Sequence, residues 1–338
     1  MRKEIGSEFW DIPTGKKPNN LFENATWFVS GRAAFRAILE QAVVEHPFVA
    51  RKIAIPSFLC ESMIQPIAKE NFSYSFYRVD FDNNSLIFDF SGIEDCGYIL
   101  ILDYFGYQAP QIIIPQGKIT IRDLTHSVFS QKYDDADYYF GSLRKWAGFL
   151  TGGFAYKKEG IISEPTLDCS KYVNLRKEAM RQKKSYIEEN FGDKKYLSIF
   201  RDAEELLDEC DIEISPLFDI KAAKMLDFDF LKRRRYENAK ILVEGLKQYC
   251  LFKSVKPADC PLCVPIIINN RDVLRKHLIE KNIYCPIHWP KPEQVPDGVS
   301  TKLYANELSL VCDQRYGKDD MNRIVETVLS FMESENNA

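Results

Sequence analysis

The sequence has no long apolar run and no basic stripe. No run approaches the roughly 20 apolar residues that a membrane-spanning helix needs, and the N-terminal residues lack the apolar core of a signal peptide. The net charge is -4, and basic residues are not interleaved with aromatic ones as they are in nucleic-acid-binding surfaces. We therefore expect a protein that binds neither membranes nor nucleic acid.

Glycine-rich phosphate motifs and metal-binding spacings are missing as well. The absence of dinucleotide and P-loop fingerprints argues against a Rossmann oxidoreductase or a kinase. Cys260 and Cys263 form one C-x-x-C pair, but a zinc site needs four ligands, and no second pair lies at a suitable distance. The nine cysteines are odd in number and scattered, so we expect reduced thiols and a cytoplasmic location.

What is present is the composition of a globular protein, with 45% hydrophobic and 28% charged residues in a chain of 338. In the first half, short apolar or aromatic runs alternate with helical stretches, which predicts βαβ units and a mostly parallel sheet. The expected strands are Ile53–Ile55, Tyr74–Tyr77, Tyr98–Leu102, Ile119–Ile121 and Phe154–Tyr156, and the expected helices between them are Gly31–Val44 and Glu61–Glu70.

The second half has a different pattern. Residues 171–248 are rich in charge and helical in spacing, and most of these charges are interpreted as solvated helix faces. Mixed signals follow, with strands expected at Leu262–Ile268 and Tyr284–Cys285 and helices at Arg271–Lys281 and Asp319–Met332. We expect an N-terminal arm (1–25), a large α/β domain (26–235) and a small C-terminal α+β domain (236–338).

Three polar pieces follow predicted strands, where ligands collect in open α/β sheets. Ser30–Ala34 opens a helix whose N–H groups could bind a phosphate, or it is a plain helix cap. Asp123, with His126 three residues on, could bind a pyridinium proton, cap a helix or bind a metal. Lys145 follows an aromatic strand and Ser142, and it is either a Schiff-base lysine or a surface lysine beside Arg144.

In this order, the pieces resemble the DegT/DnrJ/EryC1/StrS family of pyridoxal-phosphate (PLP) aminotransferases. The resemblance runs from about Trp27 to Asn238. The similar segments are Ser30–Ala34, Pro56–Cys60, Leu100–Gly106, Asp123–His126, Lys145, Gly152–Gly153, Ile220–Lys224 and Arg234–Asn238.

The resemblance implies the type I, aspartate aminotransferase-like fold of PLP-dependent transferases, a homodimer and a set of roles. Lys145 would form the Schiff base with PLP, and Asp123 would bind the pyridine nitrogen. The other implied cofactor-binding residues are Gly31, Arg32, Ala33, Phe58, His126, Ser142 and Ser215. The substrates would be an amino-acid donor and a keto acceptor. Analogy with the family suggests a nucleotide sugar as the acceptor. His288, Trp289 and Arg315 are candidates for the substrate side or for ordinary packing.

The sequence also departs from the family pattern. The serine five residues before the lysine is replaced by Phe140, so Ser142 takes its place in the prediction. The asparagine that the neighbouring subunit contributes is absent near Ile214–Pro216, which leaves Ser215 as a substitute. Two alternatives therefore stay open. One is another PLP reaction, such as that of a lyase or dehydratase, and the other is a non-catalytic protein of the same fold.

Overall fold

The computed structural model describes residues 4–82, 85–107, 112–130 and 135–336. Its centre is a sheet in the order β2-β9-β8-β7-β6-β3-β4-β5. The strands are β2 (Thr26–Phe28), β3 (Lys52–Pro56), β4 (Ser73–Asp82), β5 (Ser85–Asp89), β6 (Tyr98–Leu102), β7 (Ile119–Asp123), β8 (Tyr138–Ser142) and β9 (Gly153–Lys157).

The middle of this sheet is parallel and its edges are antiparallel. Strands β4, β3, β6, β7 and β8 run parallel, whereas β5, β9 and β2 pair antiparallel to their neighbours. The fully apolar β6 is buried along its whole length, as expected for a strand covered on both faces. The prediction of a mostly parallel α/β sheet is confirmed.

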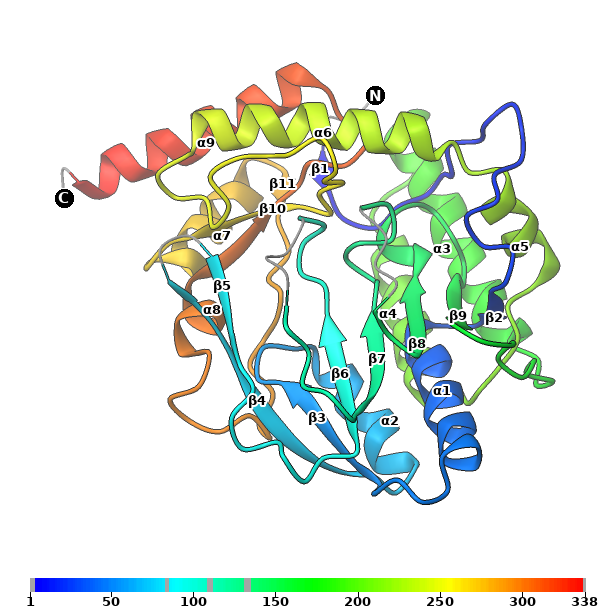
Figure 1. Ribbon diagram of the computed structural model, residues 1–338. Coiled ribbons are helices and arrows are strands. Elements are labelled where there is room, and N and C mark those ends of the chain that lie inside the picture. Colours follow the sequence, from blue (N-terminus) through cyan, green and yellow to red (C-terminus); the bar gives the residue numbers. More distant parts are fainter. Residues whose placement is uncertain (1–3, 83–84, 108–111, 131–134, 337–338) are drawn as a thin grey trace.

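Two helices near the N-terminus pack beside this sheet (Figure 1). Helix α1 (Gly31–Glu45) is capped by Ser30 and places its buried alanines and Phe35 against β8 and β9. The predicted helix at 61–70 is a 3₁₀ turn, η1 (Glu61–Met63), followed by α2 (Ile64–Lys69). The connection between β7 and β8, for which the sequence predicted no helix, contains none among its described residues.

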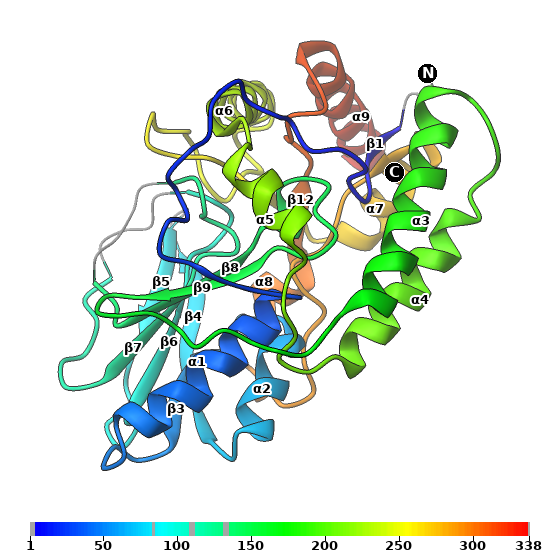
Figure 2. The same cartoon turned by 90° about the vertical axis from the view of Figure 1, so that its right-hand side faces the viewer.

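The charge-rich region forms four helices. Helices α3 (Ser170–Glu188) and α4 (Tyr196–Glu209) make a long hairpin on one side of the molecule (Figure 2), and α5 (Leu217–Lys224) leads into α6 (Phe228–Gly245). Helix α6 bridges two hydrophobic clusters: Leu231 belongs to one with Trp146, and Leu242 belongs to one with the C-terminal segments. The predicted domain boundary at 235/236 thus falls inside a continuous helix.

The C-terminal part packs around its own apolar core. It contains β10 (Val264–Ile267), α7 (Arg271–Glu280), β11 (Ile283–Tyr284), α8 (Thr301–Asn306), β12 (Glu307–Leu310) and α9 (Lys318–Asn336). The N-terminal arm joins this part, because β1 (Ile5–Gly6) pairs with β11. Across the described residues, no helix combines the length and the apolar character that crossing a membrane requires.

Candidate functional site

The site lies where the parallel strands end. Asp103 follows β6, Asp123 ends β7 and Ser142 ends β8, so the parallel register brings all three to one edge of the sheet. After β8 the chain turns through η2 (Leu143–Lys145). These residues line a cavity of about 270 Å³ together with the N-terminus of α1. The ends of three strands and the N-terminus of α1 thus line one cavity.

The α1 end of the cavity is built for close approach. A Cβ on Gly31 would lie 3.3 Å from the Ser142 Cβ and 3.4 Å from the Gly141 carbonyl oxygen, so glycine lets the helix start approach β8 without a tight contact. The Ser30 hydroxyl accepts the Ala33 N–H at 3.1 Å, which leaves Ala33 outside the cavity lining. The predicted residues Gly31, Arg32 and Ser142 do line the cavity.

Asp123 is a buried carboxylate with few partners. It accepts the Thr125 N–H at 2.7 Å and is 6% exposed. In the described part of the chain no lysine or arginine forms an ion pair with it. Burial raises its pKa from 3.8 to about 6, although hydrogen bonds from the Thr125 side chain and backbone act in the opposite direction. The group is thus poised to receive a cationic or protonated partner.

His126 is held as a neutral hydrogen-bond donor. Its Nδ1 accepts the Phe105 N–H at 3.3 Å, so the ring proton sits on Nε2. Burial, His288 and Lys145 keep the pKa of His126 well below its ordinary value. The Trp289 ring stacks on His126 with centroids 5.2 Å apart. His126 and Trp289, from distant parts of the chain, form one aromatic wall of the cavity.

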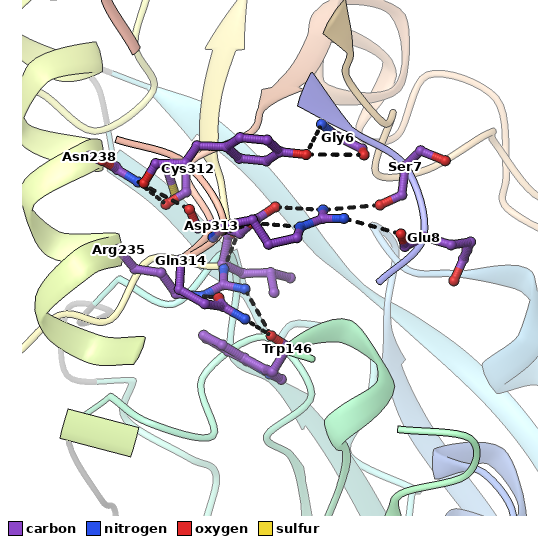
Figure 3. Close-up of polar contacts among 12 residues, drawn as sticks. Gly6, Ser7, Glu8, Trp146, Arg235, Asn238, Cys312, Asp313 and Gln314 are labelled. Carbon is purple, nitrogen blue, oxygen red and sulfur yellow. Dashed lines mark hydrogen bonds and ion pairs between the residues drawn. The ribbon is translucent and has the colours of Figure 1, made fainter. Parts of the chain in front are cut away.

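Lys145 is exposed, but the chain beside it is rigidly held (Figure 3). The carbonyl of Trp146 accepts hydrogen bonds from Gln314 at 2.7 Å and from Arg235 at 3.3 Å. The Arg235 guanidinium lies 4.6 Å from the Trp146 ring centroid. The Trp146 indole N–H donates to the Thr125 carbonyl at 2.8 Å, which ties the lysine turn to the loop after Asp123. The exposed Lys145 side chain therefore extends from a turn whose next residue is held by three hydrogen bonds.

A second cavity of about 470 Å³ opens on the other side of Lys145. His288 and Arg315 line it, as does Glu8 of the N-terminal arm. Arg315 is fully engaged, since it binds the Asp313 carboxylate at 2.8 Å and the Ser7 and Glu8 carbonyls at 3.0 and 3.1 Å. Figure 3 shows Asp313, Ser7 and Glu8 at this junction. Arg315 thus anchors the arm, while His288 and Trp289 face the two cavities.

Three predicted residues lie outside both cavities: Ala33, Phe58 and Ser215. Phe58 is fully buried, with its ring 5.2 Å from Trp289, and the segment after it contributes Cys60 to the wall instead. Ser215 is 1% exposed and hydrogen-bonds to the Thr151 hydroxyl. Their predicted contacts with the cofactor stay predictions.

One side of the first cavity was missed by the sequence analysis. Helix α4 lines it with Glu204 and Asp208, one helical turn apart. Glu204 pairs with Arg144 at 2.7 Å, and Asp208 pairs with Arg32 at 2.7 Å. The interpretation of this helix as a solvated charged face is therefore incomplete. The signal in the sequence is the i, i+4 spacing of the acids around Leu207.

The structure has close likenesses among solved structures, although no protein-family model and no curated protein matches the sequence. It matches a DegT DnrJ EryC1 StrS aminotransferase from Brucella abortus with a TM-score of 0.61 and 17% identity, covering 91% of this chain and 85% of that one. It matches Helicobacter pylori PseC, an aminotransferase involved in the biosynthesis of pseudoaminic acid, with a TM-score of 0.63 and 15% identity, covering 97% and 100%.

A third match has a different stated activity. It is a GDP-4-keto-6-deoxymannose-3-dehydratase with bound GDP-perosamine, with a TM-score of 0.62, 15% identity and coverage of 91% and 89%. At these identities the matches establish the fold. The chain has the type I fold of PLP-dependent transferases, and the resemblance to the DegT/DnrJ/EryC1/StrS aminotransferases is confirmed as a structural likeness with low sequence identity.

Proposed function

We propose that this chain is a PLP-dependent aminotransferase that transfers an amino group from an amino-acid donor to a keto acceptor. One observation carries the proposal. Asp123, a buried carboxylate with no cation paired to it among the described residues, shares a cavity with the exposed amine of Lys145. Titratable groups with perturbed pKa values that converge on a cavity are typical of an active site.

The residues of the first cavity fit the parts of PLP. Asp123 would accept a hydrogen bond from the protonated ring nitrogen, and this partner would offset the burial that raises its pKa. The fixed Nε2–H of His126 would donate to the ring oxygen. The N–H groups at the start of α1 and the Ser142 hydroxyl would receive the phosphate, aided by the helix dipole.

Each group would then have a defined task in the transfer. The cofactor supplies an electron sink for the bond broken at the donor carbon. Lys145 would hold it covalently and, once displaced by the donor amine, would move the proton at the donor Cα. Asp123 would keep the ring nitrogen protonated. The bonds from Gln314 and Arg235 to Trp146 would keep the Lys145 backbone in place while its side chain moves.

The acceptor is proposed to be a nucleotide sugar. Two of the solved structures are described with such molecules, one with a TDP-sugar product and one with GDP-perosamine. The second cavity, beside Lys145, offers space next to the first one. We also propose a homodimer, because Leu167, Leu217 and Phe218 have exposed apolar side chains, and Leu167 pairs with Glu213 shortly before the start of α5.

The test is covalent labelling of Lys145. The purified protein is mixed with PLP and reduced with borohydride, and its peptides are analysed by mass spectrometry. We expect one modified peptide containing Lys145, and no such label in Lys145→Ala. Lys195→Ala, which removes an exposed lysine far along the chain, should keep the label. An unlabelled wild-type protein would show that the fold is used without this chemistry.

The reaction itself needs a second assay. Incubation of the loaded protein with glutamate should produce 2-oxoglutarate in a first half-reaction without any acceptor. A lyase that holds PLP through Lys145 would form no 2-oxoglutarate. A non-catalytic relative would fail both assays.

A further inference from the structure

Glu307, the first residue of β12, is a fully buried carboxylate. Its Oε2 accepts the backbone N–H of His288 at 2.8 Å, and its Oε1 accepts the Ser309 hydroxyl at 2.5 Å. Within the described residues it has no ion-pair partner, and burial raises its pKa to about 8. An unpaired buried carboxylate is costly to a fold, so a purely structural role would be served better by a neutral amide.

Ser309 connects this carboxylate to an imidazole. The Ser309 Oγ lies 2.7 Å from His288 Nδ1 and also accepts a weak bond from the Cys263 thiol at 3.1 Å. A hydroxyl has one proton to donate. When Glu307 is ionised, Ser309 donates to it and His288 Nδ1–H donates to Ser309. When Glu307 is protonated, it donates to Ser309, and Ser309 donates to a bare His288 Nδ1.

The other end of the chain of bonds reaches the second cavity. His288 lines this cavity together with Lys145, and its ring centroid lies 4.9 Å from that of His126. Since Nδ1 is occupied by Ser309, Nε2 is the nitrogen available to a molecule in the cavity. The two states of Glu307 therefore present two faces to a substrate: Nε2 as an acceptor, or Nε2–H as a donor.

We propose that His288, Ser309 and Glu307 form a proton relay that ends at His288 Nε2, beside Lys145. A substrate O–H or N–H gives its proton to Nε2, His288 passes its Nδ1 proton to Ser309, and Ser309 passes its own proton to Glu307. The carboxylate becomes a carboxylic acid, and the imidazole stays neutral throughout. The reverse sequence delivers a proton to a substrate oxygen or nitrogen. Which substrate atom takes part rests on the proposed function.

The relay explains how a deeply buried histidine can exchange protons. Burial and Lys145 lower the pKa of His288 to about 3, so a simple imidazolium is strongly disfavoured. Passing the second proton on to Glu307 avoids that cation. The charged and titratable groups around the relay include five residues: Arg271 from α7, Cys263, Cys285, Lys145 and His126.

The relay can be tested without any cofactor, because the chain has four histidines. Protein labelled with ¹⁵N-histidine gives two-bond proton–nitrogen correlations that identify the tautomer of each ring. In the wild type, His288 should carry its proton on Nε2 near pH 6.5 and on Nδ1 near pH 9.5. The change of tautomer should occur at about the pH at which Glu307 ionises. The spectrum of His288→Gln assigns the resonance, and His277, on α7, serves as the internal control.

Two variants decide between a relay and a structural contact. Glu307→Gln keeps a hydrogen-bonding side chain that cannot take up a proton, so the His288 tautomer should no longer change with pH. Ser309→Ala removes the connecting hydroxyl and should have the same effect, which covers the case that Glu307→Gln fails to fold. A wild-type tautomer that is constant with pH, or a change that persists in either variant, would overturn the proposal. Borohydride labelling of Lys145 is independent of these outcomes.

Discussion

Asp123→Asn should stabilise the cofactor-free protein at neutral pH, and the structure sets the size of the gain. The carboxyl is 6% exposed, and its pKa is raised by burial from 3.8 to about 6. At about 1.36 kcal/mol for each tenfold change in proton affinity, this difference corresponds to roughly 3 kcal/mol. Asparagine keeps an oxygen for the Thr125 N–H and has no charge to bury. The variant should therefore regain most of that free energy.

The pH dependence follows from the sign of the shift. The folded state has the higher pKa, so it binds more protons than the unfolded chain between about pH 4 and pH 6. Wild-type stability therefore falls as the pH rises through this window. The gain of Asp123→Asn should be absent below about pH 4, grow through the window and stay constant above about pH 6.

Urea unfolding of the cofactor-free proteins at about pH 4 and pH 8 measures this difference. Asp103→Asn is the matched control, because Asp103 is equally buried at the end of the neighbouring strand but pairs with Arg122 at 2.5 Å. Its removal leaves a buried arginine with one partner fewer and should lower stability. The reasoning is refuted if Asp123→Asn is no more stable than wild type at pH 8, or if its gain is the same at both pH values.

Two further predictions concern the arm and the surface. Arg315→Ala should lower the free energy of unfolding by about 2–4 kcal/mol and expose the arm to proteolysis, because it removes the bonds to Asp313 and to two arm carbonyls. The comparison is Arg181→Ala, which removes an exposed arginine of α3 that pairs with Glu178. Equal cleavage of both variants would contradict the role of Arg315 in holding the arm. Leu217→Glu should convert a dimer to monomers in light scattering, since the Leu217 side chain is 71% exposed in an apolar group. The control is Val273→Glu, also exposed but distant on α7, which should leave the mass unchanged. A dimer that survives Leu217→Glu would place the interface elsewhere.

Local patterns predicted the elements that carry the first cavity. The strand Tyr98–Leu102 was predicted at its observed bounds, and the helix after Ser30 began where expected. These features depend on short-range chemistry: an apolar run between polar breaks, and a hydroxyl before a helix start. Asp123 and Lys145 meet because both follow parallel strands of one sheet, which the βαβ pattern implies.

The sequence did not predict the roles of residues that depend on partners distant in the chain. Glu204 and Asp208 have the spacing of a solvated helix face, and only the folding of the α3–α4 hairpin turns them toward Arg144 and Arg32. Glu307 lies within strand β12, which no pattern predicted. Its contact with His288 joins this strand to the segment after β11. Antiparallel strand β5 was missed for the same reason, since its partner alone defines it.

Buried carboxylates divide by the partners that the fold gives them. Asp103 and Asp313 have arginine partners, and Asp219 has no arginine but receives the Thr151 N–H, the Thr151 hydroxyl and the Leu150 N–H. These three are satisfied within the chain. Asp123 receives hydrogen bonds from Thr125 and faces the first cavity, and Glu307 reaches the second cavity through Ser309 and His288. A carboxylate that the fold buries without neutralising has a ligand or a proton as its partner. Asp123 and Glu307 are two such carboxylates, and the cavities that they reach are both lined by Lys145.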